Sequence, residues 1–174
     1  MLDAIEELKT RARLLHRRAR NGDEPALQRI GKLPEFAKQA PGTATIQLKH
    51  GLAVLAREFG FSGWSHARRV LEGQPEETDF GTLLYPRACF AFTNHWCARY
   101  EDAREIREQT GGYLLAYRTQ FFVVTRTYVE TMGLNPDDPD WSAIGWDWAR
   151  PAEPRARARL YAKLIAAKAP EVAC

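Results

Sequence analysis

Residues 46–71 decide the fold of the first half of the chain, and they read IQLKHGLAVLAREFGFSGWSHARRVL. Their apolar side chains recur at intervals of four, three and four residues and are expected to line one side of a helix: Leu48, Leu52, Leu55 and Phe59. Gly60 follows at the place where a left-handed glycine commonly ends a helix. Ala67 and Val70 then point inward from a second, shorter helix over 65–71. The stretch therefore predicts a helix, a tight turn and another helix.

The residues before this stretch are predicted to be helical as well. A first helix over 2–20 has an apolar side and a basic side, and Asn21-Gly22 ends it. Asp23 is the expected N-cap of a short helix to Ile30, and a long helix is expected over 45–59. Residues 1–75 contain 13 Lys and Arg against 8 Asp and Glu, whereas residues 76–174 contain 12 against 14. We therefore predict a basic helical subdomain over residues 1–75.

Residues 76–174 differ in composition, and a polar connector at 73–77 separates them from the helical part. Four of the five tryptophans lie in this second part. The expected elements are strands at 82–85 and 88–93, a helix over 100–110, one bent strand or a hairpin over 113–124, a helix from Thr125 or Arg126 to Met132, and a helix over 153–168. We predict an α+β fold in which the helical N-terminal part packs on a small sheet with helices, and an aromatic-rich α+β subdomain over 76–174.

Composition restricts the class of protein. The chain has 174 residues, of which 45% are hydrophobic, so it can build a core. The longest apolar runs, such as 121–124, are far shorter than the roughly 20 residues that cross a bilayer. The first residues are acidic, unlike a signal peptide. The cysteines Cys89, Cys97 and Cys174 lack the spacing of a disulfide scaffold, and Cys174 is expected to carry an incidental exposed thiol. We expect a soluble cytoplasmic protein with no membrane partner.

One short string resembles a known module. Residues 56–64, AREFGFSGW, resemble the pattern Ala-basic-x-Phe/Tyr-Gly-Phe/Tyr-x-x-Trp in a helical module of uncharacterised bacterial proteins. That module accompanies larger domains, among them glyoxalase-related and ankyrin-like ones. The similarity covers about 25 of the 174 residues. A module that occurs with unrelated partners implies a local fold only, so we transfer no functional residue from it.

Basic residues in the first part suggest contact with nucleic acid or another acidic partner. The candidates on the N-terminal basic face and on the helix after the turn are Arg17, Arg18, Arg68 and Arg69. The offset from Ala56 to Gly60 matches a helix-turn-helix motif, but His66 occupies the next apolar position of that motif. An extra turn residue would rotate the second helix by about 100°. A helix-turn-helix-like DNA-binding regulator therefore stays an alternative.

Cys89, His95 and Cys97 could form a metal or thiol site, because thiolate and imidazole are zinc ligands. Their spacing lacks the paired cysteines and the four ligands of a structural zinc site. We therefore expect no metal and no cofactor. A small enzyme with a Cys/His-containing pocket, with His95 and Cys97 as catalytic candidates, stays an alternative.

The segment from Asn135 to Trp148 suggests a calcium loop through three of its four acidic residues: Asp137, Asp138 and Asp140. The segment lacks the alternating ligands, the central glycine and the distal glutamate of such a loop. Asp140 is instead a candidate N-cap for a short helix that begins with Trp141.

Aromatic residues are concentrated in the second part, and we expect them to outnumber those that a small core requires. Aromatic rings with a few polar groups are typical of ligand pockets and partner surfaces. The predicted ligand-binding residues are Trp96, Tyr117, Arg118, Gln120, Trp146 and Trp148. We predict a binding or interaction protein with an aromatic-lined site for a small molecule or a protein partner.

Overall fold

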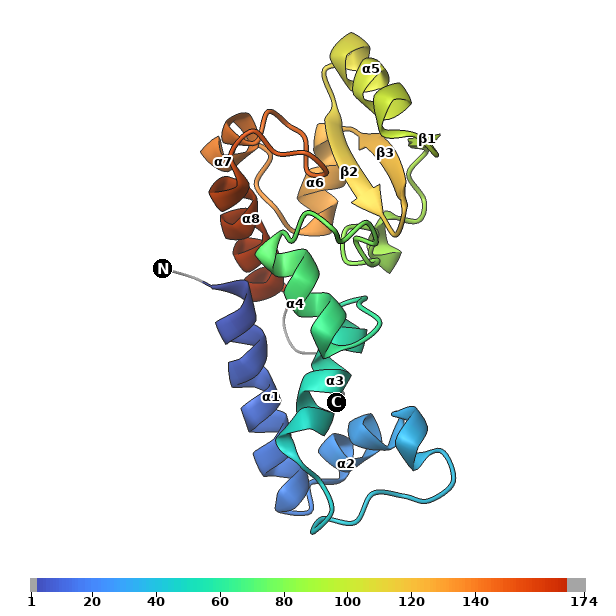
Figure 1. Ribbon diagram of the computed structural model, residues 1–174, viewed down its shortest axis with the longest axis vertical. Helices are drawn as coiled ribbons and strands as arrows, with labels where there is room; N and C mark the ends of the chain where they lie inside the picture. Colours follow the sequence, from blue (N-terminus) through green and yellow to red (C-terminus); the bar gives the residue numbers. More distant parts are fainter. Residues whose placement is uncertain (1–2, 169–174) are drawn as a thin grey trace.

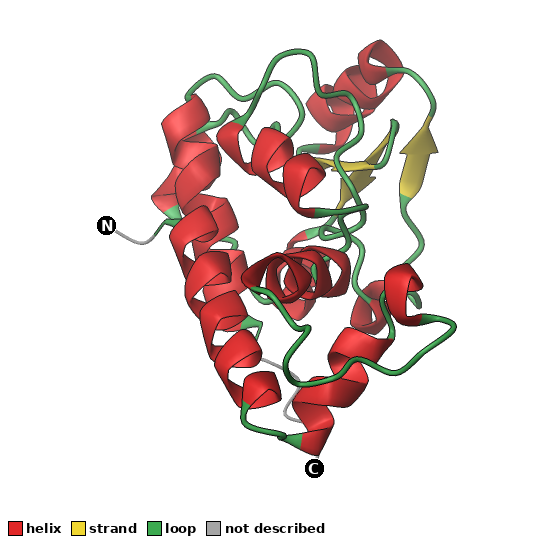
Figure 2. Cartoon of the chain, turned by 60° about the horizontal axis from the view of Figure 1, so that its bottom comes forward, coloured by secondary structure: helices red, strands yellow, loops and turns green. Residues whose placement is uncertain are grey.

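The computed structural model describes residues 3–168 and has an α+β fold (Figure 1). The helices are α1 (Ala4–Arg20), α2 (Glu24–Gly31), α3 (Leu48–Glu58), α4 (Trp64–Glu72), α5 (Tyr100–Thr110), α6 (Arg126–Met132), α7 (Pro139–Ala143) and α8 (Pro154–Ala167). The strands are β1 (His95–Cys97), β2 (Tyr113–Tyr117) and β3 (Gln120–Val124), and two short 3-10 helices are η1 (Pro34–Phe36) and η2 (Arg87–Cys89). Helices dominate the molecule and the small sheet lies toward one end (Figure 2). The predicted fold class is confirmed.

The first helix and α3 pack closely against each other. Asp3 begins α1 by accepting hydrogen bonds from the amides of Ile5 and Glu6. Gly51 of α3 faces the backbone of Ala12 in α1, and a Cβ atom at Gly51 would lie 2.7 Å from the carbonyl oxygen of Ala12. Only glycine permits this approach, because carbon and oxygen atoms rarely come so close.

The turn after α3 agrees with the sequence analysis, whereas the start of α3 differs from it. Gly60 has a φ of 85° and ends the helix as predicted. Leu55 and Phe59 are buried, but Leu48 is 38% exposed. The helix begins at Leu48 instead of Thr45, and its buried side starts only at His50. The first predicted core position is therefore wrong.

The sheet is antiparallel and its strand order is β1-β3-β2. The segment 113–124 forms the predicted hairpin. Tyr117 pairs with Gln120, and Arg118 adopts a left-handed conformation in the turn, with a φ of 51°. A left-handed residue at this position suits a tight hairpin turn.

The predicted strands at 82–85 and 88–93 are wrong. The Tyr85 amide donates to the Thr82 carbonyl at 3.0 Å, and the Cys89 amide donates to the Pro86 carbonyl at 2.8 Å, so both segments turn instead of extending. Their apolar residues anchor an irregular loop, in which Leu83, Leu84 and Cys89 are buried. The strand that pairs with the hairpin lies further along the chain than these segments, at β1.

The two faces of the sheet have different cover. Helix α5 covers one face through a small cluster of buried residues: Tyr100, Ala103, Leu114 and Val123. The other face joins the main core, which also contains residues from α1, α3, α4 and α8. Helix α8 returns to the helical part, where Arg11 of α1 donates to the carbonyl of Lys168 at 2.7 Å. One core therefore runs across the predicted boundary near residue 75, and the division into two subdomains stays a prediction.

Among residues 3–168, no helix combines the length and the apolar character that crossing a membrane requires.

Candidate functional site

Four aromatic side chains form a connected group at the surface, which we call the aromatic cluster: Tyr85, Phe90, Trp96 and Tyr117. The ring of Tyr85 stacks on Phe90 at 4.9 Å and meets the rings of Trp96 and Tyr117 edge-on at 5.3 and 5.5 Å. Phe90 is 56% exposed and Trp96 is 42% exposed. The cluster therefore holds its rings in fixed contact and still presents apolar surface to solvent.

The sheet positions one half of the aromatic cluster. Trp96 pairs with Phe122 across β1 and β3, and the two rings stack at a centroid distance of 4.5 Å. Tyr117 is the last residue of β2, so the hairpin turn places it at the end of the sheet. Its ring lies edge-on to Trp96 at 5.7 Å. Cross-strand and edge-on aromatic pairs of this kind hold both rings in place.

The loop before β1 positions the other half. The hydroxyl of Tyr128 donates to the carbonyl of Leu84 at 2.8 Å, and this hydrogen bond is buried. Cys89 is buried beside Tyr128, with its thiol 3.9 Å from the Tyr128 carbonyl. The two anchored residues directly precede Tyr85 and Phe90 in the chain, so the loop presents both rings beside the sheet although η2 is its one regular element.

A groove with a volume of about 610 Å³ runs beside the aromatic cluster. One side of the groove comes from the end of α3 and the following turn, including Leu55, Phe59 and Gly60. The other side comes from the loop at Thr82–Phe90 and from Tyr117, and the end of α8 contributes Lys168. Segments that are far apart in the sequence thus enclose one concave surface.

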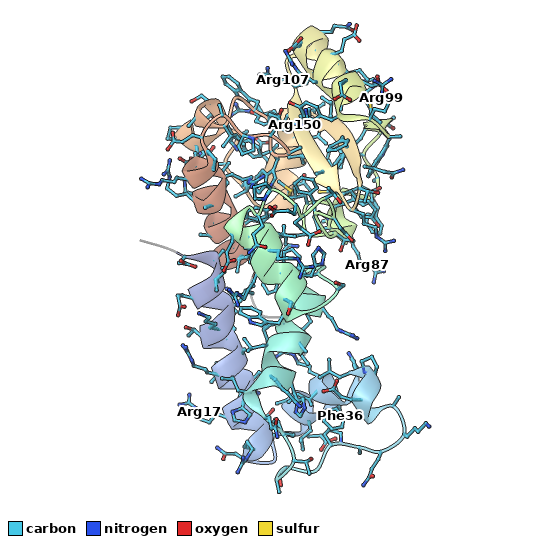
Figure 3. All side chains as sticks on the ribbon, viewed as in Figure 1. Arg17, Phe36, Arg87, Arg99, Arg107 and Arg150 are labelled. Atoms are coloured by element: carbon cyan, nitrogen blue, oxygen red, sulfur yellow. The ribbon has the colours of Figure 1, made fainter. Side chains whose placement is uncertain are left out.

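The groove carries more positive than negative charge. Arg29 donates through two nitrogens to both carboxylate oxygens of Glu58, at 2.8 and 2.6 Å, so these charges offset each other. Arg57, Arg87 and Lys168 also line the groove, and none of them forms an ion pair with another residue of the described chain. Burial lowers the pKa of the Lys168 ammonium below its ordinary value. Figure 3 shows Arg87 at the edge of the molecule, between the sheet and the lower helices.

Most of the predicted ligand-binding residues lie at the same end of the sheet. Trp96 and Tyr117 belong to the aromatic cluster, and Gln120 is the partner of Tyr117 in the hairpin. The guanidinium of Arg118 lies 5.7 Å from the centre of the Tyr117 ring. The hairpin register brings Tyr117, Arg118 and Gln120 together, because Arg118 lies in the turn between two paired residues, whereas Trp96 comes from β1.

The two remaining predicted ligand contacts lie elsewhere. Trp148 is fully buried between the rings of Trp141 and Tyr161, at 5.4 and 4.8 Å, so it offers no surface to a ligand. Trp146 is 37% exposed, but it does not line the groove, and its ring lies under the guanidinium of Arg107 at 5.2 Å. The alternation of neighbouring tryptophans between surface and core was not visible in their sequence.

The cysteine and histidine candidates do not converge. Cys89 lies in the main core, whereas Cys97 packs under α5 on the other face of the sheet. Burial raises the pKa of both thiols, which disfavours the reactive thiolate. His95 is exposed on β1. Within residues 3–168, no group of three or more His, Cys, Asp or Glu residues is placed to hold a metal ion.

The acidic segment is part of an ion-pair network instead of a calcium site. Asp138, not Asp140, caps α7 by accepting a hydrogen bond from the Asp140 amide. The carboxylate of Asp140 binds Arg159 and Lys163 of α8 at 2.5 and 2.7 Å. Arg126 pairs with Asp137, and Lys163 also binds Asp138. Asp138 and Asp140 therefore join α7 to α8, and Asp137 pairs with the first residue of α6. The prediction of Asp140 as the N-cap is wrong.

Most of the nucleic-acid candidates already have acidic neighbours. Three of the four arginines form ion pairs: Arg18 with Asp23, Arg68 with Glu72 and Arg69 with Glu77. The distances from guanidinium nitrogen to carboxylate oxygen are 2.9, 3.2 and 2.7 Å. Arg17 is exposed near the lower end of α1 (Figure 3). These pairs reduce the positive charge that could face a phosphate backbone.

His66 has a structural role in the turn between α3 and α4. Its Nδ1 accepts a hydrogen bond from the Ser62 amide at 3.0 Å, so its Nε2 carries the proton and donates to the Asp79 carbonyl at 2.7 Å. The residue is 6% exposed. It therefore replaces the apolar residue of a helix-turn-helix motif and is not available to read bases.

Tyr85, Phe90 and Lys168 line the groove and were not among the residues predicted from the sequence. Tyr85 and Phe90 were assigned to strands, and Lys168 is distant from both along the chain. For Tyr85 and Phe90 the sequence signal is the Pro86 between two apolar segments, which indicates a break in a strand. The resemblance of residues 56–64 to a bacterial helical module stays a prediction. No protein-family model, no curated protein and no solved structure matches the chain.

Proposed function

We propose that this protein is a cytoplasmic binding protein whose ligand is a small molecule with an aromatic ring. The ligand occupies the groove and its ring packs on Tyr85, Phe90 and Tyr117. The observation that carries the proposal is that these three rings line the groove while Phe90 leaves 56% of its surface exposed. Large exposed rings beside a concave surface are typical of binding sites.

The size and the rigidity of the site support a small ligand. Pockets for small molecules have volumes of roughly 300–1,000 Å³, and the groove has about 610 Å³. Tyr85 contacts the other rings of the cluster, so little side-chain freedom is lost when a ligand binds. A concave site with rings held in place along one side suits a small molecule better than the flat surface of a protein partner.

The arrangement gives less support to catalysis. His95 makes no hydrogen bond to a thiol or a carboxylate within the described residues. Both described cysteines have raised pKa values, so they are poor nucleophiles at neutral pH. We therefore propose binding without a chemical step.

Titration with N-phenylnaphthylamine tests this proposal, because the dye is uncharged and its fluorescence rises when it leaves water. Phe90→Ala removes the most exposed ring of the groove, and we expect it to weaken dye binding about five- to tenfold. Trp146→Ala is the matched control, since it removes an exposed ring that lies outside the groove. The affinity of the Trp146→Ala variant for the dye should stay within about twofold of that of the wild type. The proposal fails if the wild type does not bind the dye, or if both variants lose affinity equally.

A further inference from the structure

The charges of the groove indicate the chemical class of its ligand. Arg57, Arg87 and Lys168 line the same concave surface as Tyr85, Phe90 and Tyr117, and the acidic residue Glu58 is already paired with Arg29. We infer that the ligand is an organic anion in which an aromatic ring carries a carboxylate, sulfonate or phosphate group. This inference rests on the proposed function and adds the charge of the ligand to it.

Lys168 provides the main argument. Its backbone is fixed at the end of α8, because its carbonyl accepts a hydrogen bond from Arg11 at 2.7 Å. Its ammonium has the Leu83 carbonyl as a distant partner at 3.4 Å, and it has no carboxylate partner among residues 3–168. A partly buried ammonium without a counter-ion is unfavourable, and an anion in the groove would supply one. The lowered pKa of Lys168 has the same origin.

Arg87 strengthens the argument and Arg57 adds less to it. Arg57 lies in the last turn of α3, where the helix dipole alone favours a cation. Arg87 lies in η2, which is too short for such an effect, between the cluster residues Tyr85 and Phe90. Figure 3 shows its place at the edge of the molecule. A ligand whose ring packs on Phe90 can therefore meet a guanidinium from the same loop.

Two dyes with the same ring system separate ring binding from charge recognition. Anilinonaphthalenesulfonate is N-phenylnaphthylamine with one added sulfonate, so a difference in affinity between them reports on the anionic group. We expect the wild type to bind the sulfonated dye about tenfold more tightly at low salt. In roughly 1 M sodium chloride the difference should largely disappear, because salt screens partly exposed charges.

Charge-removing variants locate the contact. Lys168→Met removes the charge and keeps an unbranched apolar side chain that is one atom shorter. We expect it to weaken binding of the sulfonated dye about tenfold and binding of the uncharged dye by no more than about threefold. Arg87 is exposed, so Arg87→Gln should not impair folding. We expect this variant to weaken binding of the sulfonated dye about three- to fivefold. Lys38→Met is the matched control, because Lys38 is exposed and does not line the groove. Circular dichroism establishes that each variant is folded, since partly unfolded proteins also bind the sulfonated dye.

The outcomes distinguish the inference from the proposed function. Equal affinities for the two dyes in the wild type would overturn the inference and leave ring binding intact. Tighter binding of the sulfonated dye that neither Lys168→Met nor Arg87→Gln reduces would also overturn it, because the charge would then be recognised elsewhere. If neither dye binds, the proposed function fails and the inference fails with it.

Discussion

Substitution of Gly51 by alanine tests the close contact between α1 and α3. A Cβ atom at this position would lie 2.7 Å from the carbonyl oxygen of Ala12, 3.4 Å from its carbonyl carbon and 3.6 Å from its Cα atom. The obstacle is backbone of another helix, so a change of side-chain rotamer cannot remove it. Helices α1 and α3 must therefore move apart, and α3 forms one side of the groove.

Two opposing terms determine the magnitude. Alanine favours a helix over glycine by up to about 1 kcal/mol. Overpacking of a rigid contact typically costs about 1–3 kcal/mol, and a backbone obstacle favours the upper part of that range. We therefore expect Gly51→Ala to lower the free energy of unfolding by about 1–2 kcal/mol. For a chain of this length, that loss corresponds to a decrease in Tm of about 3–6 °C.

Gly31→Ala is the matched control. Gly31 is also helical, but an added Cβ would meet only the Cδ of Pro41, at 3.6 Å, which is an ordinary contact. The control should leave stability unchanged or raise it by up to about 1 kcal/mol. Urea unfolding followed by circular dichroism gives both values on the same scale. If Gly51→Ala is as stable as Gly31→Ala, the close packing of α1 on α3 is incorrect.

Three further substitutions probe polar contacts of the fold. Burial lowers the pKa of His50 below its ordinary value of 6.5, so the unfolded chain binds more protons than the folded one. The free energy of unfolding should therefore fall as the pH drops below about 6.5, by at most about 1.4 kcal/mol per pH unit. His50→Gln should flatten this slope, and an unchanged slope would exclude His50 as its source. Hydrogen bonds from Arg159 and Lys163 lower the pKa of the Asp140 carboxyl, although burial opposes them. Asp140→Asn should therefore cost about 1–2 kcal/mol at neutral pH, and progressively less as the pH falls through the acid range in which the carboxylate takes up a proton. A cost that does not depend on pH would contradict the ion pair. Tyr128→Phe leaves the Leu84 carbonyl without its buried hydrogen-bond donor. It should lower the free energy of unfolding in urea by about 1–2 kcal/mol. An unchanged free energy would show that the loop does not depend on this hydrogen bond.

The helices could be predicted because their signals are local. Asp23 caps α2 by accepting a hydrogen bond from the Ala26 amide at 2.9 Å, and Gly133 ends α6 with a φ of 103°. Both follow from residue type and spacing along one short segment. The hairpin at 113–124 was also predictable, because its two strands are adjacent in the chain.

The loop at 82–92 could not be predicted, because its structure depends on distant residues. Its apolar residues have the pattern of strands, but the Tyr128 hydroxyl and the main core hold it in an irregular path. Half of the aromatic cluster comes from this loop. Trp96 and Tyr117 were therefore identified, whereas Tyr85 and Phe90 required the three-dimensional structure.

The charge of the site was hidden from the sequence for a related reason. A lysine at the end of the last helix looks like an ordinary C-terminal cation. Only packing of α8 on α1 brings Lys168 to the groove, beside residues from α3 and from the loop. Conversely, the arginines that looked most suitable for an acidic partner pair with acidic neighbours in their own helices or turns.

The most direct test of the account is a two-dimensional NMR titration of the aromatic side chains with N-phenylnaphthylamine. The account predicts that the signals of Tyr85, Phe90 and Tyr117 shift with added dye, while the signals of the buried Trp148 and of Trp146 outside the groove keep their positions. Shifts confined to Trp146, or an aromatic cluster that does not respond to a saturating concentration of dye, would contradict it.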